Sequence, residues 1–107
     1  MNPDVSIVIP LLNEEENVVP LHNELTAVLS GLPLSYEVVL VDDGSSDRTF
    51  QKLVELQAQD SAVRAIRFSR NFGQTAAFAA GFAHARGSLI VTLDGDLQND
   101  PHDIPMM

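Results

Sequence analysis

The chain has 107 residues, and its fifteen Asp and Glu against six Lys and Arg give a formal net charge of −9. This length allows one domain or part of one. The acidic balance argues against nucleic-acid binding, which needs clustered Lys and Arg, and against a polybasic membrane patch. An apolar fraction of 45% excludes a disordered chain, and the absence of cysteine suits a cytoplasmic location. The apolar runs, about five residues long, are far too short to span a bilayer.

Four short apolar runs alternate with three helical patterns. The runs cover residues 5–9, 36–41, 63–68 and 89–93, and each predicts a strand. Helices are expected over residues 14–30, from about residue 47, and over residues 74–86. Because the connections are short, the pattern predicts an α/β fold, doubly wound around a mainly parallel sheet. Arg64 and Arg67 favour an edge position for the third strand.

Local signals refine these helices. The acidic residues 14–16 are expected in the first turn of the first helix, and Ser46 or Asp47 is expected to cap the second. Gly73 fits a helix entry, and Gly81 indicates close packing against a neighbour. We expect core positions for three phenylalanines and surface positions for three histidines, namely Phe72, Phe78, Phe82, His22, His84 and His102.

The last residues contain a helix start. Asp100 is a cap residue, Pro101 suits the first helical position, and Asp103 adds an acid to the first turn. The sequence ends four residues later, which is too short for a stable helix. We therefore expect the chain to be the front portion of a longer protein.

Carboxylates follow three of the four predicted strands. In open α/β sheets, ligands bind beyond the carboxyl ends of parallel strands. Oxygen ligands of this kind suit Mg²⁺ or Mn²⁺, which usually shares its remaining positions with phosphate oxygens. The pattern therefore favours a metal–diphosphate site. The acids expected on this rim are Glu14, Asp42, Asp43, Asp94 and Asp96.

The same residues also fit structural roles. Asp94 and Gly95 are typical of a turn, and Asp42 with Asp43 fits a strand end followed by a helix cap. Asn13 fits a bridge across the turn after Pro10. The residues alone leave both interpretations open.

Four segments together are more specific than any one of them. They read IVIPLLNEEENV, EVVLVDDGSSDRT, FSRNFGQTAAFAAGF and LIVTLDGDLQNDP. This combination resembles glycosyltransferase family 2, which has the GT-A fold, and within it the polyprenyl- and dolichol-phosphate sugar transferases. The resemblance covers nearly all 107 residues.

The resemblance implies two groups of site residues. Asp43 would hydrogen-bond the base of a nucleotide, and Leu12, where the family often has Tyr, would replace ring stacking with aliphatic contact. The nucleotide pocket would comprise Pro10, Leu12, Glu14, Val41, Asp43 and Gly95. The metal, Mg²⁺ or Mn²⁺, would be held by Asp94, Asp96 and Gln98.

The implied reaction is an inverting transfer of a sugar from a UDP- or GDP-sugar to a polyprenyl phosphate. A phosphate acceptor is already anionic, its second pKa being about 6, so it needs no general base. Residues 1–107 would be the nucleotide-sugar-binding N-terminal part. The acceptor site and membrane attachment at the cytoplasmic face would follow residue 107. The fragment alone is expected to bind donor weakly without catalysing transfer, and a sheet edge exposed by truncation would promote non-native association into homo-oligomers.

Three alternative classes remain. A receiver-type signalling domain also holds Mg²⁺ on clustered acids, but it needs an acid pair after the first strand and a lysine after the last. Lys52, the only lysine, lies in a predicted helix. A non-catalytic nucleotide-sugar-binding module differs from the enzyme only in the missing half. A dinucleotide-binding half-domain would need a G-x-G-x-x-G segment after the first strand, and none is present.

Overall fold

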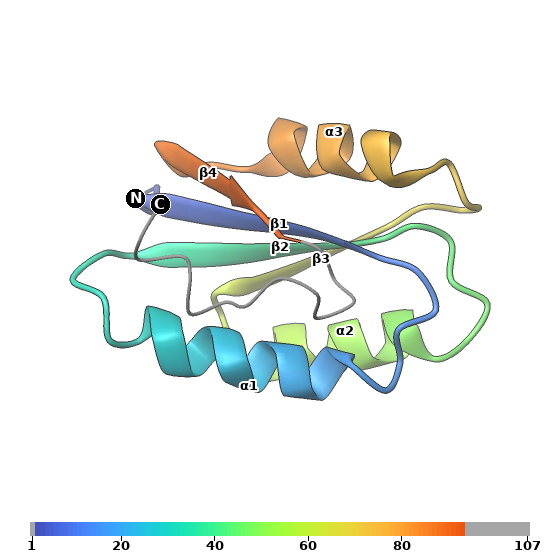
Figure 1. Cartoon of the computed structure of the whole chain (residues 1–107), viewed down its shortest axis with the longest axis horizontal. Helices are drawn as coiled ribbons and strands as arrows, with labels where there is room; N and C mark the ends of the chain where they lie inside the picture. The colour runs from blue at the N-terminus through green and yellow to red at the C-terminus, as the bar shows by residue number, and fades with distance from the viewer. Residues whose placement is uncertain (1, 94–107) are drawn as a thin grey trace.

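The computed structural model describes residues 2–93, which form an α/β fold of four strands and three helices. Helices α1 and α2 cover one face of the sheet, and α3 covers the other (Figure 1). This arrangement confirms the predicted fold class. The elements in chain order are β1 (Val5–Leu11), α1 (Val18–Leu29), β2 (Tyr36–Asp42), α2 (Thr49–Gln59), β3 (Val63–Arg67), α3 (Gln74–His84) and β4 (Leu89–Thr92).

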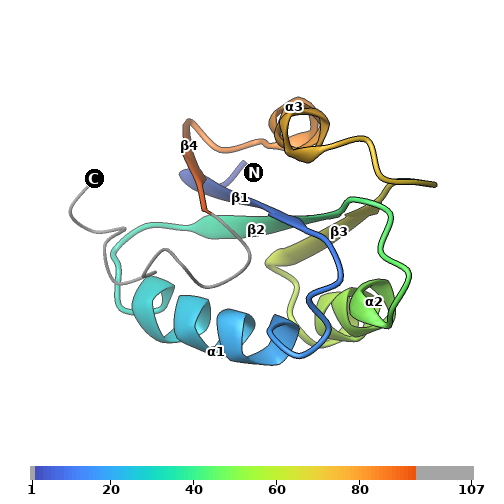
Figure 2. The ribbon, with the colours of Figure 1, turned by 45° about the vertical axis from the view of Figure 1, so that its right-hand side comes forward.

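All strand pairs in the described residues are parallel, in the order β3-β2-β1-β4. Val5 of β1 aligns with Tyr36 of β2 on one side and with Leu89 of β4 on the other. The third strand lies at one edge of this sheet, as predicted. Because every strand runs the same way, the loops after β1, β2 and β3 leave the sheet at one edge, here called the carboxyl edge (Figure 2).

The first strand is two residues longer than predicted, because Pro10 does not end it. Pro10 is buried and aligned with Val41 of β2. The Leu11 carbonyl accepts the Asp43 N–H on the β2 side. Because successive residues of a strand direct their backbone groups to opposite sides, the nitrogen and carbonyl of Pro10 face the β4 side. The described β1–β4 ladder ends at Val8, and Pro10 therefore breaks no ladder hydrogen bond.

Helix α1 begins at Val18, four residues later than predicted, and the acidic residues 14–16 lie in the preceding turn. The Glu14 carbonyl accepts the Asn17 N–H at 2.9 Å, and the N–H of Glu14 donates to Thr49. These bonds hold the acids outside the helix. Pro20, at the third helical position, costs no helical hydrogen bond there.

Two apolar clusters stabilise the layers. The larger lies between the sheet and α1 and α2, and includes Leu25 and Leu53. The smaller lies under α3 and comprises Val8, Val39, Val41 and Ala77. The strands supply both clusters because their side chains alternate between the two faces.

Gly81 faces the sheet, and a Cβ there would overlap the side chain of Val8, which confirms the close packing predicted for it. Phe78 and Phe82 stack with ring centroids 6.3 Å apart. The core prediction is wrong for Phe72 and Phe82, which are 51% and 47% exposed. Small residues on α3 pack on the sheet instead, and Phe82 lies next to them on the outer surface.

The surface prediction is wrong for His22, which is half-buried with its Nε2 2.9 Å from Asp60 Oδ2. His84 is exposed as predicted, and His102 lies outside the described residues. Among residues 2–93, no helix has the length and apolar character needed to cross a membrane.

Candidate functional site

The loops after β1 and β2 are joined at the carboxyl edge. The N–H of Asn13 donates to Ser45 Oγ at 2.8 Å, and Asn13 Oδ1 accepts the Ser46 N–H at 2.9 Å. The N–H of Glu14 donates to Thr49 Oγ1 at 2.9 Å. Asn13 has a φ of 53°, a left-handed conformation that Asn tolerates better than most residues. The two loops therefore form one surface.

Asp47 connects this surface to the start of α2. Its Oδ1 accepts the Thr49 N–H at 2.9 Å, and Oδ2 accepts the Glu15 N–H at 3.4 Å. Burial raises the pKa of Asp47, but hydrogen bonds from Thr49 and Glu15 outweigh it and hold the pKa below its ordinary value. The cap position of α2 is Arg48, so the prediction of Ser46 or Asp47 as the cap residue is wrong, although Asp47 does bind the first helical N–H, that of Thr49.

Two buried carboxylates end β2, and they have different surroundings. Asp43 Oδ1 accepts the Phe72 N–H at 2.8 Å, and Oδ2 accepts the Gly73 N–H at 3.1 Å. Asp42 Oδ1 accepts the Ser45 N–H at 3.2 Å, whereas its Oδ2 is buried and has no hydrogen-bond partner among residues 2–93. Asp43 thereby ties the loop before α3 to the carboxyl edge.

Gly44 allows this loop to approach closely. Its φ is +77°, and a Cβ at this position would lie 2.5 Å from the Asn71 nitrogen and 2.7 Å from the Arg70 oxygen. The exposed Arg70 guanidinium lies 4.7 Å from the ring centroid of Phe72. A cation and an aromatic ring therefore stand beside the Asp42–Asp43 end of β2.

An open hollow of ≈ 250 Å³ lies where the first two loops meet. Its lining is acidic and amide-bearing, and consists of Asn13, Glu14, Glu15, Glu16, Asn17 and Asp47. Within residues 2–93, no three His, Cys, Asp or Glu side chains come together as a metal site. Of the five acids expected on one rim, the three in this range thus form no metal cluster by themselves. The oxygens of Asp43 already accept backbone N–H groups, and Glu14 accepts a bond from Asn17.

The predicted pocket residues differ in their access to this surface. Leu12 is 39% exposed and Glu14 is half-buried, so both reach it. Pro10 and Asp43 are buried, and the Val41 side chain lies entirely within the cluster under α3. Gly95 and the predicted metal residues Asp94, Asp96 and Gln98 lie outside the described residues, as does the predicted helix start at residues 100–103. They follow Leu93, whose N–H donates to the Val8 carbonyl at 3.1 Å.

Sequence reasoning missed two contributors to this edge. Ser45 and Thr49 accept backbone N–H groups of the neighbouring loop, and Arg70 packs on Phe72, whose N–H binds Asp43. The run of Ser, Asp and Thr after β2 was the available signal for the first pair, because such side chains bind nearby backbone groups. The loop after β3 carried no comparable signal.

An open parallel sheet with polar loops joined at its carboxyl edge defines an α/β fold of the Rossmann-like type used by GT-A glycosyltransferases. Residues 6–107 match the model of the family described as "Glycosyl transferase family 2", and the chain belongs to that family.

Relatives and solved structures agree with this assignment. The chain is 48% identical over 105 residues to a dodecaprenyl-phosphate galacturonate synthase of Rhizobium johnstonii, covering 97% of this chain and 31% of that protein. It therefore spans about a third of the length of this relative. The fold is similar to mannosyltransferase PcManGT of Pyrobaculum calidifontis in complex with GDP-Man and Mn²⁺, with a TM-score of 0.72, 24% identity, and coverage of 96% of this chain and 30% of that one. The same TM-score and identity hold for S. aureus TarS 1–349 in complex with UDP-GlcNAc, with coverage of 90% and 27%.

Proposed function

We propose that residues 1–107 form the nucleotide-sugar-binding N-terminal part of an inverting glycosyltransferase that transfers a sugar from a UDP- or GDP-sugar to a polyprenyl phosphate. The observation that carries this proposal is the joined pair of loops after β1 and β2, at the edge where open parallel sheets bind ligands. The 48% identity to a synthase named for a dodecaprenyl phosphate supports the acceptor class.

The donor nucleotide lies against the joined loops in this proposal. Leu12 supplies aliphatic contact to the base, and Glu14 lines the pocket beside it, since both side chains are accessible at this edge. Pro10 and Val41 form the floor of the nucleotide pocket, since both are buried and aligned near the carboxyl ends of β1 and β2. Each Asp43 oxygen accepts one N–H, from Phe72 or Gly73, and keeps a second lone pair that accepts a hydrogen bond from the base.

A divalent metal completes the donor site. We assign it to Asp94, Asp96 and Gln98, with the backbone of Gly95 against the nucleotide sugar. An all-oxygen ligand set fits Mg²⁺ or Mn²⁺, and a fold neighbour is described in complex with GDP-Man and Mn²⁺. When bound, such a metal supplies Lewis-acid stabilisation of the negative charge that grows on the departing diphosphate.

The acceptor phosphate needs little activation by this chain. A phosphate monoester is anionic near neutral pH, so its oxygen can displace the diphosphate without a general base. Transfer then proceeds with inversion at the sugar carbon. The acceptor site and the attachment to the cytoplasmic face of the membrane belong to the rest of the protein. A homo-oligomer would cover the sheet edge at β4.

Family membership removes the receiver-domain interpretation and leaves one alternative, a nucleotide-sugar-binding module without transferase activity. The test is a transfer assay on the full-length protein, with labelled UDP- and GDP-sugars and a short polyprenyl phosphate. The enzyme hypothesis predicts metal-dependent formation of a lipid-linked sugar, abolished by Asp96→Ala. Donor binding with no transfer to any polyprenyl phosphate would favour the binding module.

A further inference from the structure

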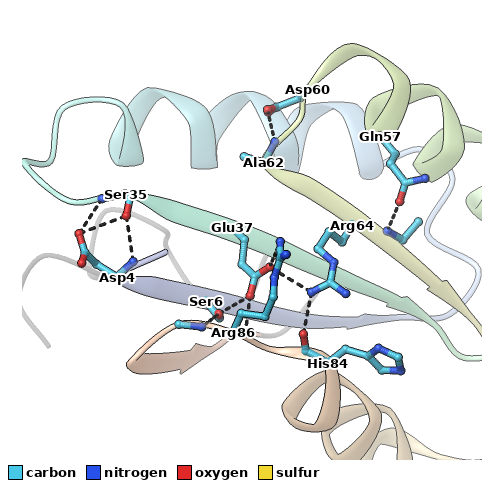
Figure 3. A network of polar contacts seen from close by, with 12 residues as sticks. Asp4, Ser6, Ser35, Glu37, Gln57, Asp60, Ala62, Arg64, His84 and Arg86 are labelled. Carbon is cyan, nitrogen blue, oxygen red and sulfur yellow. Dashed lines mark hydrogen bonds and ion pairs between the residues drawn. The ribbon is translucent and has the colours of Figure 1, made fainter. Parts of the chain in front are cut away.

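A buried carboxylate lies at the opposite, amino edge of the sheet. Glu37 of β2 is only 2% exposed, and Figure 3 shows the polar side chains that converge on it. Ser6 Oγ donates to Glu37 Oε2 at 2.6 Å, and the Arg86 N–H donates to the same oxygen at 2.7 Å. Arg64 Nη1 donates to Glu37 Oε1 at 3.1 Å. A carboxylate this buried and this fully bonded fixes the groups that bind it.

The bonded groups come from β1, β3 and the connection between α3 and β4. Ser6 Oγ also accepts the Gly87 N–H at 2.8 Å, so one carboxylate and one hydroxyl hold two successive N–H groups of that connection. Arg64 Nη1 also donates to the His84 carbonyl at 2.6 Å, which ties the last turn of α3 to the same carboxylate. We call Ser6, Glu37, Arg64 and Arg86 the Glu37 network.

Close backbone packing reinforces the network. A Cβ at Gly87 would lie 2.6 Å from the Ser6 nitrogen and 2.7 Å from the Val5 carbonyl carbon. Only glycine therefore lets the connection lie directly against β1. The chain passes from α3 into β4 at one fixed position on the sheet.

The strand that follows is short and, within residues 2–93, has only two buried side chains, Val91 and Leu93, near it to set its register. In the described part of the chain, β4 pairs only with β1, over four residues from Leu89 to Thr92. Leu89, Ile90 and Thr92 are exposed, and Val91 is the one buried side chain of these four residues. A shift of one residue would turn every side chain of β4 to the other face, which the burial of Val91 and Leu93 opposes. The connection held by Glu37 adds a second constraint on register, because it fixes the chain directly before β4.

The register of β4 decides where the residues after it begin. Leu93 donates its N–H to the Val8 carbonyl, and the next residue along the chain is Asp94. We propose that Glu37, at the amino edge, is a positioning residue for the metal-binding segment 94–98, acting through the α3–β4 connection and the register of β4. This inference rests on the proposed function, because it takes Asp94 and Asp96 as metal ligands.

The test compares four variants with the unmodified full-length protein. Glu37→Gln and Ser6→Ala each remove part of the Glu37 network, and the milder Ser6→Ala covers the case in which Glu37→Gln does not fold. Gln57→Ala is the matched control, because it removes one side-chain hydrogen bond to the same sheet, in which Gln57 Oε1 accepts the Ala65 N–H of β3 at 2.8 Å. Leu56→Ala, in the core under α2, controls for a general loss of stability.

Two readouts separate positioning from stability. The first is the Mn²⁺ concentration that half-saturates nucleotide binding, measured by calorimetry. We expect it to rise about tenfold in Glu37→Gln and Ser6→Ala, as for other residues that orient metal ligands, and to stay unchanged in both controls. The second is hydrogen exchange of residues 86–93, which we expect to accelerate only in the two network variants.

Unchanged Mn²⁺ dependence in folded Glu37→Gln and Ser6→Ala would overturn the positioning role and leave the proposed function intact. Equal increases in Leu56→Ala would also overturn it, because stability alone would then explain the effect. If the unmodified protein binds nucleotide with no Mn²⁺ dependence, the proposed metal site fails. The exchange data then decide separately whether Glu37 fixes the register of β4.

Discussion

Asp43 and Gly73 are joined across the carboxyl edge, where the Asp43 carboxylate accepts the Gly73 N–H at 3.1 Å. Gly73 is the residue from which α3 starts, and its φ of 99° is accessible to glycine. The second Asp43 oxygen accepts the N–H of Phe72. One buried carboxylate therefore fixes both the entry to α3 and the loop beside the proposed donor pocket.

Replacing this carboxylate tests its structural contribution. Asp43→Asn loses the charge and one acceptor oxygen, and we expect the free energy of unfolding to fall by about 2 kcal/mol, since hydrogen bonds to charged groups contribute about 1.5–3 kcal/mol. Urea denaturation measures the change. Glu16→Gln, which removes an exposed charge from the same edge, is the control and should leave the midpoint unchanged. Equal midpoints for the two variants would contradict the account.

The contact between Gly44 and the loop of residues 70–71 predicts a steric effect. Gly44→Ala would place a Cβ 2.5 Å from the Asn71 nitrogen in a positive-φ conformation, so we expect a loss of about 2–3 kcal/mol, near the upper end for strained backbone positions. Gly31→Ala is the matched control, because a Cβ there would lie 3.6 Å from the Val28 carbonyl oxygen, an ordinary contact, and the φ of Gly31 is not positive. That substitution should be neutral or raise stability by about 0.5 kcal/mol. Similar thermal midpoints for both variants would show that the 70–71 contact is unimportant.

Two substitutions of Asn13 distinguish the stability contribution of its left-handed backbone conformation from that of its side-chain hydrogen bonds. Asn13→Gly keeps the left-handed conformation but loses the two hydrogen bonds that Ser46 donates to Asn13 Oδ1. Asn13→Ala loses both the bonds and the conformation, so we expect it to be less stable than Asn13→Gly by about 1 kcal/mol. Chemical denaturation of the two variants measures this difference. If Ala is as stable as Gly, the left-handed conformation does not persist in solution.

The pH dependence of stability reports on Glu37. Burial raises the pKa of Glu37, but hydrogen bonds from Ser6, the Arg86 N–H and Arg64 outweigh it and hold the pKa below its ordinary value of 4.5. The folded state therefore binds this proton less readily than the unfolded state does. The stability contribution is complete above the unfolded pKa and is lost as the pH falls through the lower folded pKa.

We therefore expect the unfolding free energy to decrease as the pH falls below about 4.5, and part of this decrease to be absent in Glu37→Gln. Thermal unfolding at a series of pH values from neutral to strongly acidic measures both curves. Asp47 and Asp60 also have lowered pKa values, so the variant retains the remaining acid dependence. Parallel curves for the two proteins would contradict the assignment to Glu37.

The sequence predicted the elements and their order because apolar periodicity follows directly from burial. It predicted the edge position of β3 from Arg64 and Arg67 and the close packing of Gly81, and the structure confirms both. It was wrong about the ends of β1 and α1. Pro10 stays within β1 because β4, the strand that its backbone faces, pairs with β1 only as far as Val8. The apolar pattern of β1 alone does not reveal where β4 ends.

The candidate site was predictable in location and less so in detail. Acids after β1 and β2 do lie at the carboxyl edge, as the strand pattern indicates. Their bonding was not predictable, because the partners of Asp43 lie 29 and 30 positions further along the chain. Glu37 was also missed, since a single Glu inside an apolar run gives no sign that Ser6 and Arg64 will meet it.

We propose above that the carboxyl edge binds a nucleoside diphosphate through a metal held by Asp94 and Asp96. Calorimetric titration of this 107-residue chain with UDP and with GDP, each with and without Mn²⁺, tests it most directly. We predict that one nucleotide binds measurably only when Mn²⁺ is present and that Asp96→Ala removes this binding. Nucleotide binding that is equal with and without Mn²⁺, and equal in Asp96→Ala, would contradict the account.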